Sequence, residues 1–138
     1  MTLWTPNLGQ LQLLDKMLKK ALSTDEGYYL KLYQNNYTPD ANSAPGSFTE
    51  ATFTNYAVMT LARATWNSSV IVSGAAQTSY GSSPLSWTCG ASGNTIYGYY
   101  VVGATSNVVL WAELFATSRV LANQDVLNLT PQFTLIHS

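Results

Sequence analysis

The chain has 138 residues, of which 46% are apolar and 12% aromatic, so it can form the core of one domain without a disulfide or a structural metal. Only 9% of the residues are charged, against about 25% in an average soluble domain, and the net charge is −1. This composition disfavours nucleic-acid binding, which needs a basic patch, and the lack of a long apolar run disfavours a membrane span.

The first predicted element is an amphipathic helix over residues 8–22. Asn7, which follows Pro6, is expected to cap its amino end by accepting a hydrogen bond from a free amide of the first turn. Gly27 ends the helical pattern because glycine readily takes a positive φ. The helix prediction depends on leucines that recur every three or four residues and so form one stripe, namely Leu8, Leu11, Leu14, Leu18 and Leu22.

Short strands are predicted after Gly27. Residues 28–33 alternate, with Leu30 and Leu32 on one face and tyrosine or lysine on the other, which is typical of a half-buried strand. A polar loop at 35–46, a loop or short-strand region at 73–84 and a hairpin loop at 104–107 separate the other segments. Further strands are predicted over 56–64, 70–73, 85–89, 95–102, 108–115 and 132–136, with shorter candidates at 117–121 and 125–129.

About seven to nine short strands at regular spacing predict a mainly β fold. We expect an antiparallel β-sandwich, or a jelly-roll or barrel, with one N-terminal amphipathic helix. Strands do not alternate with long helices, so a parallel α/β fold is disfavoured. Residues 1–138 are predicted to form a single domain, with the helix at 8–22 and the β domain at 28–138.

The residue types that most catalytic and metal sites require are scarce. His137 is the one histidine and Cys89 the one cysteine, so we expect no Ser-His-Asp triad and no zinc site. Cys89 is interpreted as a small buried hydrophobe. No Gly-rich phosphate loop is present. The expectation is therefore a protein with no enzyme activity, no cofactor and no metal.

Paired carboxylates are the remaining catalytic alternative, because two of them on different segments could meet as they do in a glycosidase. Glu50 lies in a predicted turn or short helical segment at 48–53. Glu113 lies on the polar register of a strand whose other face holds Leu110 and Ala112. Solvent exposure is expected for both, which argues against a catalytic pair. The full candidate set is Asp40, Glu50, Glu113 and Asp125.

The aromatic residues indicate a contact surface. If Ile96, Tyr100 and Val102 face the core, the opposite face is aromatic where that of a monomer would be polar. We expect the N-terminal helix or a protein partner to cover it, since interface centres are poor in charge and rich in aromatics. A stacking platform for sugar or single-stranded nucleic acid is the alternative. The candidate interface residues are Trp4, Tyr29, Tyr33, Tyr97, Tyr99 and Trp111.

Five segments follow one another in a recognisable order. They are YLKLYQNN at 29–36 with Thr38-Pro39 after it, FTEATFTNYA at 48–57, IYGYYVV at 96–102, LWAELF at 110–115 and LTPQFTL at 129–135. This succession resembles small virion structural proteins of tailed bacteriophages, which are tail-fibre-like or head-decoration proteins with a β-sandwich or jelly-roll fold. The resemblance covers most of the chain and includes no catalytic motif.

The resemblance implies a non-enzymatic virion structural protein. The favoured role is a capsid decoration or cement protein that binds neighbouring capsid subunits. The alternative is a tail-tip or tail-fibre-associated adsorption module that binds host-surface glycan. Expected partners are the protein itself, as a homo-oligomer such as a trimer, and major capsid or tail proteins, with no nucleic acid and no membrane. No secretory signal is visible, so synthesis in the host cytoplasm and location in the virion are expected.

Overall fold

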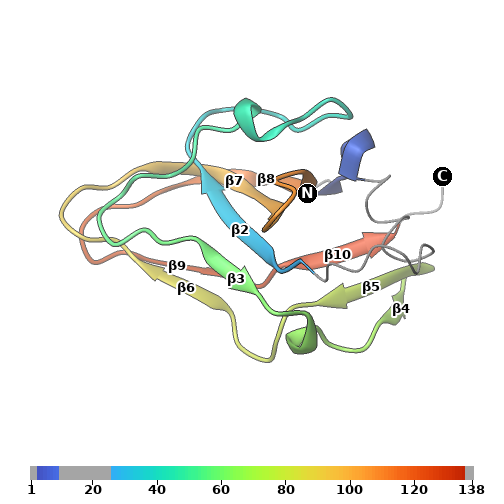
Figure 1. Ribbon diagram of the computed structural model, residues 1–138. Coiled ribbons are helices and arrows are strands. Elements are labelled where there is room, and N and C mark those ends of the chain that lie inside the picture. Colours follow the sequence, from blue (N-terminus) through green and yellow to red (C-terminus); the bar gives the residue numbers. More distant parts are fainter. Residues whose placement is uncertain (1–2, 10–25, 136–138) are drawn as a thin grey trace.

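The computed structural model describes residues 3–9 and 26–135. These residues are mainly β, and their antiparallel sheets pack against each other as a β-sandwich (Figure 1), which confirms the predicted fold class. A helix begins at Asn7, the predicted cap position, and Asn7, Leu8 and Gly9 are helical. The rest of the helix predicted over 8–22 lies outside the described residues.

The first layer is a five-stranded antiparallel sheet in the order β1-β8-β7-β2-β3. The predicted hairpin at 104–107 joins β7 to β8, and β8 includes most of the short candidate at 117–121 before it ends at Val120. The strand predicted over 56–64 is shorter than expected, because the 3-10 helix η2 (Arg63–Thr65) follows it closely. The strands are β1 (Leu3–Trp4), β2 (Tyr28–Tyr33), β3 (Met59–Leu61), β7 (Thr95–Gly103) and β8 (Val109–Val120).

The second layer consists of two smaller antiparallel sheets. A three-stranded sheet has the order β10-β5-β4, and a two-stranded sheet pairs β6 with β9. β9 is followed almost directly by β10, so the two sheets succeed each other along one side of the sandwich (Figure 1). The strands are β4 (Val70–Val72), β5 (Ala75–Ser79), β6 (Leu85–Thr88), β9 (Val126–Leu129) and β10 (Gln132–Leu135).

The main core lies between these layers and a second cluster lies on the outer face of the five-stranded sheet. Leu30, Leu32 and Val101 are fully buried in the main core with residues of the second layer such as Trp87. The second cluster is covered by the loop after β2, which contains the 3-10 helix η1 (Pro45–Ser47). Its buried members are Tyr33, Phe48, Tyr100, Val102, Val109 and Ala112.

The predicted faces of β7 and β8 are partly wrong, because the pairing of these strands contains two irregularities. The register shifts between Ile96 and Gly98, where β8 contributes three more residues than β7, and the alternation of side chains along β7 reverses there. Ile96 therefore shares the main core with Tyr99, whereas Tyr100 and Val102 face the outer cluster. A second shift, between Val101 and Val102, changes the faces along β8 in the same way.

Candidate functional site

Within the described residues β4 lies at an open edge of the three-stranded sheet, and it carries three exposed apolar side chains. Val70, Ile71 and Val72 are 56%, 73% and 45% exposed. A strand that is apolar on both faces is normally buried. Soluble proteins usually protect an edge strand with charge, proline or a bulge, and β4 itself contains no charged residue and no proline. β4 is therefore a candidate protein-interaction surface.

The turn after β4 determines which backbone groups face the open edge. Ser73 and Gly74 have φ values of 51° and 80°, as a two-residue type I′ hairpin turn requires. In such a hairpin the flanking residues Val72 and Ala75 exchange hydrogen bonds, and hydrogen-bonded pairs then alternate along the ladder. The N–H and C=O of Ile71 consequently point away from β5, toward the open edge.

An apolar row crosses the three-stranded sheet at Ile71. Ala76 of β5 pairs with Ile71 on one side and with Leu135 of β10 on the other, so the three side chains lie on one face. Leu135 is 56% exposed. We call Val70, Ile71 and Val72, together with Ala76 and Leu135, the β4 edge. It is an apolar surface that continues from the strand edge onto one face of the sheet.

An apolar pocket of about 130 Å³ lies between the layers. Apart from Thr78 its walls are aromatic, and they present almost entirely apolar atoms to the pocket. The indole N–H of Trp111 is buried and has no hydrogen-bond partner of good geometry within the described residues. It still partly offsets the rise that burial causes in the pKa of the Tyr99 hydroxyl. Such a pocket suits a small apolar group rather than a charged one, as apolar cavities of similar size do. Its walls are Tyr28, Trp66, Thr78, Trp111 and Phe133.

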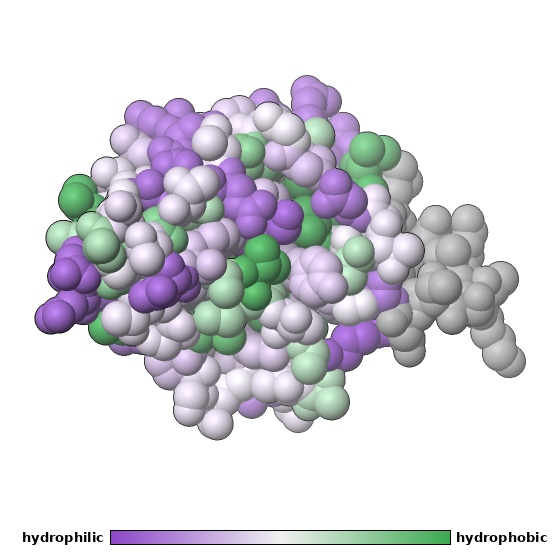
Figure 2. Space-filling view, turned by 60° about the vertical axis from the view of Figure 1, so that its left-hand side comes forward, coloured by the Kyte–Doolittle hydropathy of each residue, from purple (hydrophilic) through white to green (hydrophobic). Residues whose placement is uncertain are grey.

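Charge is absent from a long part of the chain that includes β4 and Ala76. No charged residue occurs between Arg63 and Glu113 in the sequence. The residues that flank β4 are small or polar and uncharged, from Asn67 to Ser69 and from Ser73 to Ala76. The face turned forward in Figure 2 differs, because its hydrophobic residues form small patches among hydrophilic ones. The β4 edge thus combines apolar exposure with a lack of charge.

Half of the predicted interface residues are not on the surface. Trp4 and Tyr29 are 41% and 37% exposed, and their pairing with Ala112 and Val102 places both on the outer face of the five-stranded sheet. Tyr97 is half-buried against the outer cluster. The other three lie inside the chain's own packing and cannot contact a partner in this conformation, namely Tyr33, Tyr99 and Trp111.

Two features bury these three residues. Tyr33 is at the end of β2, where Phe48 of the following loop packs against it with ring centroids 5.0 Å apart. Tyr99 and Trp111 point into the main core because of the register shifts in β7 and β8. Phe48, from the segment at 48–53, therefore covers Tyr33, and irregular pairing turns Tyr99 and Trp111 inward.

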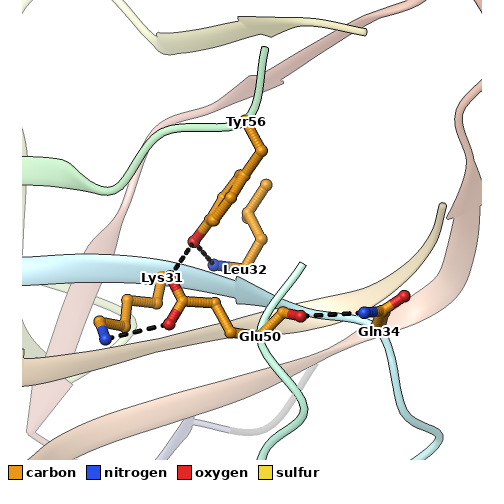
Figure 3. A network of polar contacts seen from close by, with 5 residues as sticks. All are labelled: Lys31, Leu32, Gln34, Glu50 and Tyr56. Atoms are coloured by element: carbon orange, nitrogen blue, oxygen red, sulfur yellow. Dashed lines mark hydrogen bonds and ion pairs between the residues drawn. The ribbon is translucent and has the colours of Figure 1, made fainter. Parts of the chain in front are cut away.

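Glu50 belongs to a polar network beside β2 (Figure 3). Its carboxylate accepts hydrogen bonds from Lys31 Nζ at 3.0 Å and from Tyr56 Oη at 3.1 Å. Its carbonyl accepts one from Gln34 Nε2 at 3.0 Å. The segment at 48–53 was predicted as a turn or short helix, but Glu50 instead forms an antiparallel bridge with Tyr33. Burial, and then the nearby charge of Glu50, raises the pKa of Tyr56 well above its ordinary value of 10.

The other candidate carboxylates also have local structural partners. The predicted solvent exposure of Glu50 and Glu113 is wrong, since both are half-buried. Glu113 accepts a hydrogen bond from Tyr99 Oη at 2.7 Å. Asp40 Oδ1 accepts from the backbone N–H of Asn42, and Asp125 Oδ2 accepts from that of Ala122, both at 2.8 Å. The four carboxylates thus take part in separate sets of hydrogen bonds.

Groups that could hold a metal or form a reactive thiol centre are also scarce in the described part of the chain. No cluster of three or more His, Cys, Asp or Glu side chains occurs within residues 3–9 and 26–135. Cys89 is free and buried, as predicted, and its thiol contacts the carbonyls of Gly90 and Ser92. No helix in the same ranges has the length and apolarity to cross a membrane.

Sequence reasoning found the strand at 70–73 but not its exposure. Three adjacent β-branched residues are typical of a buried strand, and only the order of the strands shows that β4 lies at an edge. Comparisons of the chain with protein-family models, curated proteins and solved structures find no match. The functional proposal therefore depends on the surface itself.

Proposed function

We propose that this protein is a non-enzymatic structural subunit of a tailed-phage particle that packs against other protein subunits through its β4 edge. The observation that carries the proposal is the exposure of three adjacent apolar side chains on an uncharged edge strand. Full burial of one Val or Ile side chain contributes about 1.5–3 kcal/mol. Covering the exposed parts of these three would contribute about 3–5 kcal/mol before the cost of association.

Within the particle we propose a capsid decoration or cement role. A compact sandwich with an apolar sheet edge suits contact with flat neighbouring subunits. The involvement of the carboxylates in separate structural hydrogen bonds supports a role without catalysis. A tail adsorption module that binds glycan has less support. Sugar recognition needs several polar groups, and the walls of the aromatic pocket are almost entirely apolar.

Two exposed residues allow a matched test of the proposal. Ile71 and Val120 are β-branched strand residues with 73% and 74% exposure, but only Ile71 belongs to the β4 edge. Phage particles assembled without this chain would be mixed with each purified variant, and bound protein would be measured after sedimentation. Ile71→Lys should reduce occupancy strongly, whereas Val120→Lys should leave it unchanged. Circular dichroism and melting temperature would establish that both variants are folded.

The results of this experiment test the β4 edge and the virion setting separately. Equal occupancy of the unchanged protein and folded Ile71→Lys would contradict the proposed use of the β4 edge. No binding of the unchanged protein to such particles would contradict the virion setting. Copy number distinguishes head from tail, because symmetric assembly gives roughly hundreds of copies on a capsid and about three to twelve on a tail.

A further inference from the structure

We infer that β4 pairs with the β4 strand of a second copy of this chain, antiparallel and around a two-fold axis at Ile71. The inference rests on the proposed function, because it names the first partner of the β4 edge. The pair would join two three-stranded sheets into one six-stranded sheet. Four observations support this occupant over a different protein: the symmetry of the strand, its free hydrogen-bonding groups, its apolar row and its lack of charge.

The side chains of β4 are symmetric about Ile71. In a two-fold antiparallel pair centred there, Val70 of one copy faces Val72 of the other, and Ile71 faces Ile71. Every cross-strand contact is then between β-branched apolar residues, which are favourable cross-strand neighbours. Polar and small residues flank the strand on both sides, with Ser69 before it and Ser73 after it. The two ends of β4 are therefore equivalent as partners.

The backbone of β4 has the matching geometry. The N–H and C=O of Ile71 point toward the open edge, and a two-fold axis at this residue brings them to the same groups of the second copy. Ile71 would thus form the hydrogen-bonded type of antiparallel pair, with Cα atoms about 5.5 Å apart. The Val70 and Val72 positions would form non-hydrogen-bonded pairs, with Cα atoms about 4.5 Å apart. No other described strand pairs with this edge.

The apolar row would become continuous across the two copies. Ile71, Ala76 and Leu135 share one face of the sheet, so pairing at Ile71 aligns this row with its equivalent in the second copy. Ile71 is 73% exposed and Leu135 is 56% exposed, and pairing would cover the first beside an identical side chain. The row would then extend over six strands instead of ending at an exposed isoleucine.

Charge favours a second copy over a different protein. A two-fold contact places each residue near its own equivalent, so any charge at its centre would meet the same charge. β4, at the centre of the contact, avoids this repulsion, since no charged residue lies between Arg63 and Glu113 in the chain. Recognition of a different protein is usually directed by complementary charges, which this edge does not offer.

The size of the contact predicts a weak dimer. A stable interface buries about 800 Å² on each partner, and three partly exposed side chains supply much less. We therefore expect self-association only at high protein concentration, and stable pairing where many copies are held side by side on one particle. Sedimentation of the unchanged protein should show a concentration-dependent dimer. Ile71→Lys should abolish this dimer and Val120→Lys should preserve it.

Disulfide trapping tests the register directly. The Val70 and Val72 positions would face each other across the axis within the range that a disulfide can span, whereas each is too far from its own equivalent. A mixture of Val70→Cys and Val72→Cys proteins, of different mass, should form a mixed dimer under mild oxidation. Each variant alone should form little dimer. Val120→Cys is the matched exposed control, and the unchanged protein controls for the buried Cys89.

Each outcome decides between the occupants. A mixed dimer in excess of both homodimers supports the pairing. Equal trapping in all combinations, trapping of Val120→Cys at the same rate, open-ended aggregation, or a monomer at every concentration would overturn it. If self-pairing fails while particle occupancy still depends on Ile71, the edge binds a different protein and the proposed function stands. If pairing occurs without any binding to particles, the proposed function fails and the self-pairing stands.

Discussion

The Tyr56 hydroxyl fills a gap in the hydrogen bonds along β2, and its removal gives a sharp test of the fold. β3 pairs with β2 only as far as Leu30 opposite Met59, and further along Ala51 donates to the Leu32 carbonyl. Between these contacts the Leu32 amide donates to Tyr56 Oη at 3.2 Å. Tyr56→Phe removes this acceptor and keeps the aromatic ring (Figure 3).

The expected loss of stability follows from the burial of Leu32. Leu32 is 0% exposed, and a buried donor without a partner costs about 1–3 kcal/mol. Glu50 loses one hydrogen bond but keeps its ion pair with Lys31 at 3.0 Å, and its side chain is 34% exposed, so this part of the loss is small. Tyr56→Phe should therefore lower the free energy of unfolding by about 2 kcal/mol. The melting temperature should fall by roughly 5–8 °C.

Urea unfolding followed by tryptophan fluorescence would measure this loss. Tyr97→Phe is the matched control, because Tyr97 is half-buried and its hydroxyl makes no hydrogen bond within the described residues. The control should change the free energy of unfolding by less than about 0.5 kcal/mol. A loss below that value in Tyr56→Phe, or an equal loss in both variants, would refute the role of Tyr56 as the acceptor for Leu32.

Three further predictions concern buried groups. Burial raises the pKa of Tyr33 and Tyr99 well above 10 and that of Tyr100 to about 12, so the folded state retains protons that the unfolded state releases above pH 10. These tyrosines should therefore leave the free energy of unfolding unchanged below pH 10. Between about pH 10 and 12 each tyrosine should lower it by about 1.4 kcal/mol per pH unit. A free energy of unfolding, measured with urea, that does not change over this pH range would contradict the prediction. Glu26→Ala should cost about 3 kcal/mol in the same assay, because its buried carboxylate accepts hydrogen bonds of 2.8–3.0 Å from the turn after β7; a loss below 1 kcal/mol would contradict this role. Gly98→Ala should prevent soluble expression or cost more than about 3 kcal/mol, because a Cβ there would overlap the backbone of β8 and lie 2.6 Å from Tyr33 Oη; wild-type stability would show that the strands can separate.

The sequence was sufficient to predict most strand positions, because alternation of side chains is a local property. β1 was not predicted, and β5 falls in the region predicted as a loop or short strand. The strand at 28–33 and the hairpin at 104–107 were predicted and are confirmed. Side-chain faces were harder, because a bulge reverses them with little signal in the sequence. In the run from Ile96 to Val102 the one signal is Gly98, because a glycine inside a strand often marks a bulge or a close approach of the backbone. The same limit explains why Tyr99 and Trp111 were assigned to an outer face although they lie in the main core.

The β4 edge could not be predicted for a different reason. Whether Val70, Ile71 and Val72 are buried depends on the order of strands in the sheet, which is determined by contacts between distant parts of the chain. Within the described residues the sheet ends at β4, so a segment with the composition of a buried strand is exposed. An apolar, uncharged edge of this kind promotes unwanted pairing unless another chain covers it. The feature that makes β4 a liability for an isolated monomer is therefore the same feature that suits it to pairing in an assembly.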